Sequence, residues 1–210
     1  LDAPKVPDEE LSLALPWLVK DLIDQPTEEL ALDAFKLPVG GDQVEKIYVV
    51  IAEKERLRKT KQFINEAKLR LAKIDILELA LLPIAKQLSA SEKGCGLIYQ
   101  NGQDVNFLLT KNGQLHFTRK LGSMANLETG AQNQPLILEL QRSIDFCQIQ
   151  LRQTAPETIH VMPGLEALTQ ETNEVTLPLQ NVSAELFIED PKKSLCLATL
   201  GEALSYEATN

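Results

Sequence analysis

The middle of the chain holds the pattern that most constrains its fold, because three short apolar segments follow one another with only turns between them. Asn-Gly pairs stand at 101–102 and 112–113, one in each turn. Asn-Gly is the strongest short-range signal for a two-residue hairpin, since both central residues of that turn need positive φ. The pattern therefore predicts a three-stranded antiparallel meander with strands at Gly94–Tyr99, Asp104–Thr110 and Gln114–Lys120.

Helices and strands are expected on both sides of this meander. Apolar stripes at intervals of three and four residues predict helices, and β-branched or alternating segments predict strands. Before the meander we expect a helix from Asp8 that Pro16 kinks or divides, a hairpin of strands 30–37 and 46–52, a helix over 54–72, a strand over 73–77 and a helix over 78–88. After it we expect a helix that begins at Pro135, a strand over 158–162, a short helix over 165–169, a strand over 182–188 and a closing helix over 195–206. This order predicts an α/β protein with a mixed sheet.

The charge and the cysteines limit the classes of function. The chain has 210 residues and a formal net charge of −9, which argues against general nucleic-acid binding, because phosphates attract a basic face. Its three cysteines, Cys95, Cys147 and Cys196, lie far apart, so we expect buried thiols and a reducing compartment. Neither a signal peptide at Leu1–Pro7 nor an apolar stretch of about 20 residues is visible. We therefore expect a cytoplasmic protein that reaches a membrane only through a partner or through a segment outside this sequence.

One expected helix has a charge opposite to that of the whole chain. Residues 53–73 carry eight Lys or Arg and three Glu. The basic outward face of this helix is either a solvated surface or a contact surface for an anionic membrane or an acidic partner. For the second alternative we single out Arg58, Lys61 and Lys68 as candidate contact residues. The expected inward stripe of the helix is Leu57, Thr60, Ile64, Ala67 and Leu71.

The sequence shows no motif for catalysis or metal binding. A Gly-x-x-x-x-Gly-Lys-[Ser/Thr] loop is absent, and Gly94–Gly96 does not continue into a dinucleotide motif because Tyr99 occupies the third glycine position. The two histidines stand in separate expected strands and lack the spacing of zinc ligands. Asp75 and Glu78 are expected to be solvated or to cap a helix. We therefore expect no catalytic residue and no metal site.

Three segments carry patterns that belong together in one family. Leu15–Ile23 contains Leu-Pro-Trp followed by Lys-Asp-Leu-Ile, and Leu138–Phe146 contains Gln-Arg-Ser within a helix. Ala198–Leu204 has the pattern Ala-Thr-x-Gly-x-Ala-Leu. These segments, and the order of the expected elements, resemble the MshI/PilM family of type IV pilus biogenesis proteins. The resemblance implies an actin-like ATPase fold, with lobes of the ribonuclease-H type around a nucleotide cleft.

The same resemblance places the parts of a nucleotide site on this sequence. The second phosphate hairpin falls on the turn after Ile98, where Tyr99 stands at the position of the acidic residue that orders magnesium. The adenosine loop falls on Met162–Leu165, which keeps one glycine. The first phosphate hairpin would precede the helix at Asp8, and the chain begins too late to contain it. The residues that would line a remnant cleft are Asn101, Gly102, Gly122, Ser123 and Gly164.

The resemblance therefore implies a degenerate nucleotide site in a protein that is not an enzyme. Missing N–H donors and a missing metal carboxylate remove most of the charge compensation that a triphosphate requires. We expect no cofactor. ATP with Mg²⁺ would bind only if a hairpin upstream of Leu1 completed the site.

The resemblance also implies a domain organisation and a partner. The ribonuclease-H-like core, truncated at its N-terminus, would comprise residues 1–38 and 92–210, and residues 39–91 would be a small α/β insert of the PilM type. Such a protein is a scaffold that binds the cytoplasmic tail of a PilN-like inner-membrane protein and meets other pilus assembly components. Two alternatives remain open: the cytoplasmic domain of a GspL-like type II secretion protein, and an ATP-binding actin-like ATPase.

Overall fold

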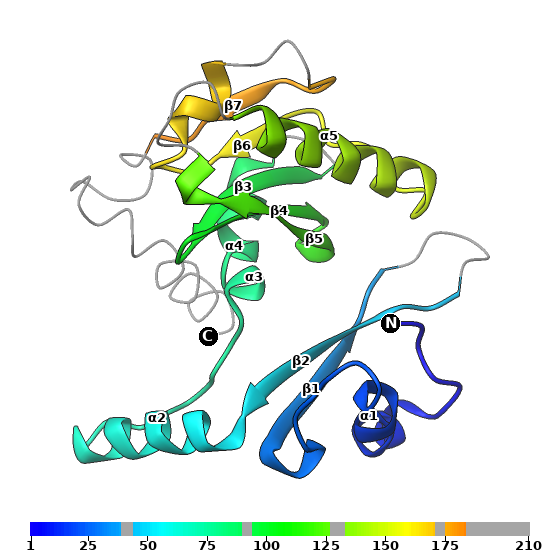
Figure 1. Cartoon of the computed structure of the whole chain (residues 1–210), viewed down its shortest axis with the longest axis vertical. Helices are drawn as coiled ribbons and strands as arrows, with labels where there is room; N and C mark the ends of the chain where they lie inside the picture. Colours follow the sequence, from blue (N-terminus) through cyan, green and yellow to red (C-terminus); the bar gives the residue numbers. More distant parts are fainter. Residues whose placement is uncertain (39–43, 90–93, 127–132, 171–174, 184–210) are drawn as a thin grey trace. The chain divides into compact units, whose positions relative to one another are not determined.

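The computed structural model describes residues 1–38, 44–89, 94–126, 133–170 and 175–183 (Figure 1). The chain divides into two compact units, Leu1–Ile76 (unit 1) and Leu77–Asn210 (unit 2). Each unit has its own sheet, with two strands in unit 1 and five in unit 2 among the described residues. The predicted combination of helices with a mixed sheet is confirmed.

Unit 1 is built on a helix and a β-hairpin. After the short η1 (Asp8–Glu10), α1 (Leu11–Val19) continues through Pro16 and buries Leu15 and Val19. After η2 (Thr27–Glu29), β1 (Leu30–Lys36) pairs antiparallel with β2 (Ile47–Glu53). The predicted hairpin is therefore confirmed, and α1 packs against β1.

The next helix, α2 (Lys54–Glu66), ends earlier than the predicted residue 72. Lys68 adopts a left-handed conformation with φ of 59°. Its N–H donates to Asn65 O over 2.9 Å, and Leu69 N donates to Ile64 O over 3.1 Å. This pair of bonds is the Schellman motif that terminates helices, here with lysine in place of the usual glycine. Residues 69–76 have no regular structure, so the predicted strand over 73–77 is wrong.

The sheet of unit 2 contains the predicted meander. β3 (Cys95–Asn101), β4 (Asp104–Lys111) and β5 (Gln114–Ser123) pair antiparallel in sequence order. β6 (Ile159–Val161) pairs parallel with β3, and β7 (Leu179–Asn181) pairs parallel with β6. The described strand order is β5-β4-β3-β6-β7.

The two turns of the meander differ from each other. At 112–113 both residues have positive φ, of 53° and 73°, as Asn-Gly predicts. In the first turn Asn101 pairs with Asp104, so the central residues are Gly102 and Gln103. Of these two, Gly102 alone has positive φ, of 60°. The prediction of an Asn-Gly turn at 101–102 is wrong by one residue, and the turn instead has glycine at its first central position, as in type II′.

β5 carries two irregularities in its pairing with β4. The register shifts between Leu109 and Thr110 and again between Val105 and Asn106. At each shift β5 has one extra residue, first His116 and then Leu121, without an opposite residue on β4. Such bulges bend a strand and increase its twist.

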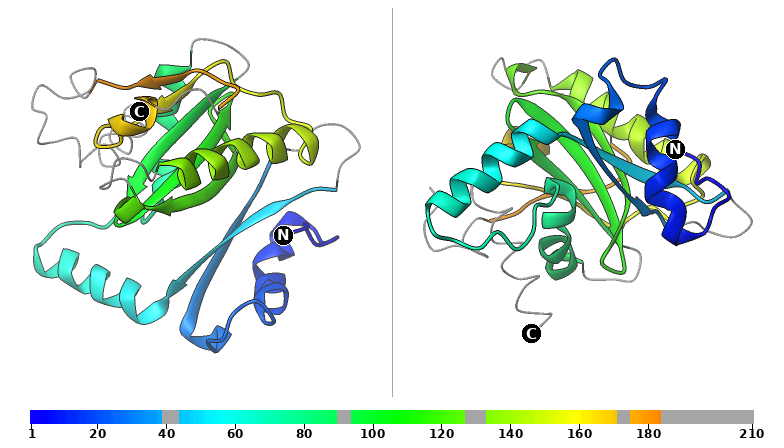
Figure 2. Two further views of the ribbon diagram at one scale, coloured as in Figure 1. Left: turned by 45° about the horizontal axis from the view of Figure 1, so that its top comes forward. Right: turned by 90° about the horizontal axis from the view of Figure 1, so that it is seen from below.

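Helices cover both faces of this sheet (Figures 1 and 2). α5 (Gln134–Ile149) has Pro135 in its first turn, as predicted, and packs on one face, where its apolar stripe joins a core with Ile98 and Phe107. α3 (Leu77–Ala80) and α4 (Leu82–Leu88) lie against the meander on the other face. The predicted single helix over 78–88 is divided, and Pro83 lies in the first turn of α4, where proline is tolerated. Short η3 (Met124–Asn126) and η4 (Glu166–Gln170) follow β5 and β6.

Some predictions fall outside the described residues or remain open. The closing helix over 195–206 and residues 184–188 of a predicted strand lie outside the described residues, and β7 ends before Val182. The division into a core of 1–38 and 92–210 and an insert of 39–91 remains a prediction. Its boundary after residue 38 would separate β1 from β2, which pair along their whole length.

Candidate functional site

The five residues predicted at a remnant cleft lie at one end of the unit 2 sheet, and we call them the turn cluster. Two belong to the β3–β4 connection, two end β5 beside the first residues of β4, and one follows β6. The carboxyl ends of β3, β5 and β6 share this end because these strands run in the same direction. The turn cluster comprises Asn101, Gly102, Gly122, Ser123 and Gly164.

Polar groups around the turn cluster bond within their own turns. Gln100 Nε2 donates to Gly102 O over 2.7 Å, and Ser123 Oγ accepts from Ala125 N at 3.4 Å. A Cβ added to Gly164 would lie 3.8 Å from Gln100 Oε1, so the β6 turn adjoins the β3–β4 turn. These contacts stabilise the turns themselves.

The backbone N–H of Gly164 donates to the chain's own carboxylate. Gly164 has φ of 92°, and its N–H bonds Glu166 Oε1 at 2.9 Å. In a phosphate site a backbone N–H of this kind points at the anion. Here a phosphate would have to displace the Glu166 carboxylate and would be repelled by it. The geometry at Gly164 is therefore unfavourable for a nucleotide phosphate.

Among the described residues, the charges beside the turn cluster leave no net positive charge for a phosphate. Asp104 at the start of β4 forms an ion pair with Lys120, with 2.7 Å between Oδ1 and Nζ. Both side chains are exposed, so the pair contributes little to stability. Together with Glu166, these groups carry two negative charges and one positive charge. A triphosphate needs the opposite balance.

Tyr99, at the position that the resemblance assigns to the magnesium carboxylate, has a structural role. It is 3% exposed, and its hydroxyl donates to Glu78 Oε1 over 2.8 Å. Thr118 Oγ1 lies 3.5 Å from the same hydroxyl. The bond joins β3 to α3, so the prediction that Glu78 is solvated or caps a helix is wrong. The partnership of these two residues depends on how α3 packs, which the sequence does not reveal.

The cysteines and histidines of the described residues do not form a nucleophilic or metal-binding group. Burial raises the pKa of both Cys95 and Cys147 to about 12, so neither is a thiolate nucleophile at neutral pH. Burial also lowers the pKa of His116 and of His160. Within the described ranges no group of three or more His, Cys, Asp or Glu could hold a metal ion. Cys196 lies outside these ranges.

The three predicted contact residues of the basic helix have different surroundings. Arg58 forms an ion pair with Glu55, which also lies 3.7 Å from Lys59. Lys61 is exposed on α2 and forms no ion pair among the described residues. Lys68 lies beyond the helix, at its left-handed terminus. No helix of the described residues is both long and apolar enough to span a bilayer.

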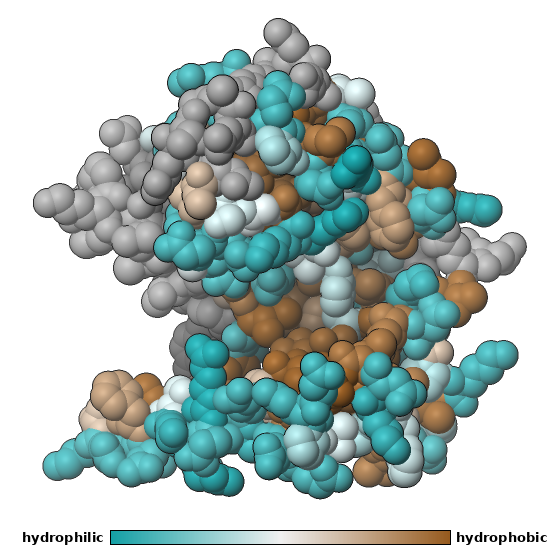
Figure 3. Space-filling view, viewed as in Figure 1, coloured by the Kyte–Doolittle hydropathy of each residue, from teal (hydrophilic) through white to brown (hydrophobic). Residues whose placement is uncertain are grey.

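Sequence reasoning missed an exposed apolar pair on α1. Leu13 is 73% exposed and Trp17 is 77% exposed, one helical turn apart. Their spacing is the signal that could have found them, since the core of unit 1 takes Leu15 and Val19 from the other side of α1. Figure 3 shows further apolar side chains at the surface along the β1–β2 hairpin. Ile51 of β2 is 39% exposed. Such surfaces mark interaction sites more often than catalytic ones.

Comparisons with known proteins connect this geometry to a fold. No protein-family model and no curated protein matches the chain. Among solved structures, the PilM-PilN type IV pilus biogenesis complex is similar with a TM-score of 0.65 and 20% identity, over 96% of this chain and 75% of that one. The cytoplasmic domain of EpsL, an inner-membrane component of the type II secretion system of Vibrio cholerae, has a TM-score of 0.54 and 15% identity, over 97% and 68%. A protein of unknown function with an actin-like ATPase fold, from Bacteroides thetaiotaomicron, has a TM-score of 0.51 and 11% identity, over 93% and 67%.

The chain has the actin-like ATPase fold, and the predicted fold class is confirmed. At 20% identity and below, the likeness concerns the fold, and function has to be argued from the chain's own residues. Those residues form a turn cluster with two acidic neighbours, Asp104 and Glu166, in unit 2, and exposed basic and apolar surfaces in unit 1.

Proposed function

We propose that this chain is a non-catalytic scaffold of type IV pilus biogenesis, of the MSHA type and corresponding to MshI, which binds the cytoplasmic tail of a PilN-like inner-membrane protein. The protein then lies in the cytoplasm at the inner membrane, where its partner holds it and where other pilus assembly components meet it. It uses neither ATP nor Mg²⁺.

The observation that carries this proposal is the hydrogen bond from Gly164 N to the Glu166 carboxylate. It occupies a backbone N–H that a nucleotide phosphate would need. The neighbouring Asp104–Lys120 ion pair leaves no excess positive charge to attract that phosphate. The likeness to the PilM-PilN complex supports the choice of partner. A scaffold needs a stable sheet and an exposed binding surface rather than a reactive group.

The partner is tested by titrating the 210-residue chain with a synthetic PilN-like tail peptide in a calorimeter. The proposal expects saturable binding, and a scrambled peptide of the same composition is the control. Equal heats for the two peptides, or no heat with either, would contradict it.

The nucleotide part is tested separately with Mg-ATP. The proposal expects no binding at micromolar concentration and no hydrolysis. The Glu166→Gln variant is the informative comparison, because it removes the carboxylate charge and keeps the side-chain oxygen at Gly164 N. Micromolar binding of Mg-ATP to the unmodified chain would overturn the non-catalytic assignment.

A second candidate is the cytoplasmic domain of a GspL-like type II secretion protein, which the likeness to EpsL supports. The full reading frame of the gene distinguishes the two candidates. A transmembrane helix encoded downstream of Asn210 favours the GspL-like protein, and a stop codon soon after it favours the scaffold.

A further inference from the structure

α2 contacts β2, and in the part of the chain that the structure describes most of its side chains are exposed, with Leu57 and Ile64 half-buried. None of its residues is buried, and Phe63 is 70% exposed. Leu69, just beyond the helix, is 61% exposed. An amphipathic helix in a water-soluble protein normally buries its apolar stripe. Figure 3 shows apolar side chains at the surface at the far end of α2, beside hydrophilic ones.

The charges of α2 are sorted around this apolar side. With 3.6 residues per turn, Leu57, Ile64 and Phe63 fall within one third of the circumference. Arg56 lies within this arc, and Lys61 and Lys54 lie along one of its borders. Glu55 falls on the opposite side of the helix, and Glu66 lies as far from the centre of the arc as Lys54 does. We call the apolar arc with its bordering cations the α2 face.

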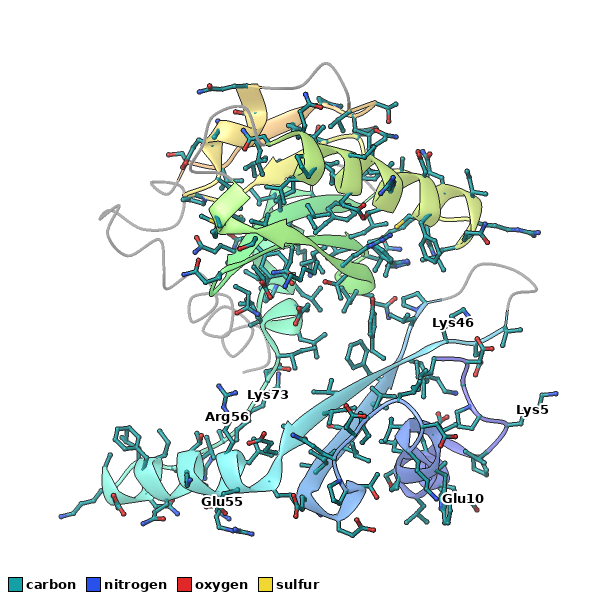
Figure 4. All side chains as sticks on the ribbon, in the orientation of Figure 1. Lys5, Glu10, Lys46, Glu55, Arg56 and Lys73 are labelled. Atoms are coloured by element: carbon teal, nitrogen blue, oxygen red, sulfur yellow. The ribbon has the colours of Figure 1, made fainter. Side chains whose placement is uncertain are left out.

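The two acidic residues within α2 bond to neighbouring side chains of the same helix. Glu55 pairs with Arg58, and Glu66 Oε1 accepts from Gln62 Nε2 over 2.8 Å. Arg56 and Lys61 form no ion pair among the described residues, so their charge is uncompensated. Figure 4 shows Arg56 and Glu55 on different sides of α2.

We propose that the α2 face docks directly on a membrane surface that contains anionic lipid, with Phe63 and Ile64 toward the acyl chains and with Arg56 and Lys61 at the headgroups. An apolar arc bordered by cations is the pattern of helices that lie in the membrane interface. Charge selects the lipid: residues 53–73 carry eight Lys or Arg and three Glu within a chain of net charge −9. Anionic headgroups therefore attract this segment and repel the acidic remainder, which also orients the molecule.

This contact goes beyond the proposed function, in which a partner alone brings the protein to the membrane. It also differs from the earlier choice of contact residues. The charge of Arg58 is offset by Glu55, and Lys68 lies beyond the helix, so only Lys61 of the three belongs to the α2 face. The two contacts are separable, because vesicle binding needs no PilN-like protein.

The first experiment is flotation of the 210-residue chain with vesicles of phosphatidylglycerol and phosphatidylcholine, against vesicles of phosphatidylcholine alone. The proposal expects binding to the anionic vesicles at 0.05 M salt and its loss at about 1 M, where the screening length falls to about 3 Å. The Arg56→Glu/Lys61→Glu variant is expected to bind at least about 25-fold more weakly, because each cation removed costs about fivefold and each new glutamate adds repulsion. The control Lys5→Glu/Lys20→Glu has the same net charge and changes two exposed lysines of the same unit outside α2.

The second experiment uses tryptophan fluorescence to find which helix meets the lipid. Phe63→Trp in a Trp17→Phe background is expected to shift to shorter wavelength and to be quenched by brominated lipid, whereas native Trp17 is not. Equal binding to neutral and anionic vesicles, equal loss in the two double variants, or quenching of Trp17 in place of position 63 would each overturn the proposal. Circular dichroism of every variant confirms that it is folded.

Discussion

The two units of this chain use apolar residues in opposite ways. Of the described apolar residues that are buried, unit 1 contributes four, namely Leu15, Val19, Leu30 and Ile47. All the other buried apolar residues belong to unit 2. Of the large apolar residues that are exposed within the described ranges, unit 2 contributes three, namely Leu138, Phe146 and Ile149. Unit 1 contributes the other nine: Leu1, Leu13, Trp17, Leu22, Val44, Ile51, Phe63, Leu69 and Ile74.

This difference separates a structural role from a binding role. Unit 2 has a sheet covered on both faces, and its core cluster includes Phe107, Leu140 and Ile144. Unit 1 has one helix on a two-stranded sheet, which is too small to supply a core of that size. The stability of the protein is therefore expected to come from unit 2, and its contacts with other molecules from unit 1.

The largest expected effect is a truncation in the core of unit 2. Phe107 is 1% exposed, and its ring centroid lies 6.3 Å from that of Phe117. Phe107→Ala should reduce the free energy of unfolding by about 3–5 kcal/mol, because it removes buried contacts and leaves a cavity. Urea unfolding followed by circular dichroism measures this loss. A loss below about 1 kcal/mol would mean that unit 2 is not the stable half.

Alkaline pH should also act on unit 2 first. Burial raises the pKa of Cys95 and Cys147 from 9.0 to about 12. Between these values the unfolded chain loses a thiol proton that the folded chain keeps, so stability falls as pH rises from about 9 to about 12, by at most about 1.4 kcal/mol per pH unit for each thiol. Thermal melting at pH 8 and pH 10.5 measures the slope. Cys95→Ala/Cys147→Ala should flatten it, and an unchanged slope would assign the effect to other groups.

The Tyr99–Glu78 bond should be the strongest polar tie between α3 and the meander. Tyr99→Phe leaves the Glu78 carboxylate without this donor and should cost about 1–2 kcal/mol. A double-mutant cycle with Glu78→Ala isolates the pair from its surroundings. If the two substitutions are additive, the hydroxyl and the carboxylate do not stabilise each other.

In unit 1, a glycine in place of Lys68 should stabilise the C-terminal end of α2. Lys68 has φ of 59°. This left-handed conformation is strained for lysine and unstrained for glycine, which has no Cβ. Lys68→Gly should stabilise the last turn of α2 by about 0.5–1 kcal/mol, visible as slower amide hydrogen exchange there. Faster exchange would mean that the lysine charge at the helix end matters more than the backbone conformation.

The smallest expected effect on stability is at the exposed tryptophan. Trp17→Ser should change the free energy of unfolding by less than about 0.5 kcal/mol, because the side chain is 77% exposed. Trp17→Phe is the matched control that keeps an aromatic ring. A loss as large as that of Phe107→Ala would show that unit 1 carries part of the core.

The sequence predicts local structure where its signals are local. The meander and the turn at 112–113 follow from short apolar segments and an Asn-Gly pair, which act within a few residues. The first turn is misplaced by one residue because cross-strand pairing of Asn101 with Asp104 sets the register. The strand predicted over 73–77 does not form, since an alternating segment becomes a strand only when another strand pairs with it.

The location of the turn cluster in the sheet can be argued from the sequence, and its hydrogen bonds cannot. Resemblance places the turn cluster at one end of the sheet, where the strand directions bring its members together. It does not reveal that Glu166 accepts from Gly164 N, because this bond depends on the course of the chain after β6. The exposure of Leu13 and Trp17 is also a tertiary property, since the same residues would be core in a larger unit.

The bulges of β5 affect the tendency of this protein to aggregate at high concentration. β5 is an outer strand of the described sheet, and an outer strand offers unpaired backbone groups to strands of other chains. Two extra residues, His116 and Leu121, break its regular spacing, and exposed Arg119 and Lys120 stand just before the second break. A foreign strand would therefore find neither a flat hydrogen-bonding edge nor an uncharged one, and aggregation through this edge is disfavoured.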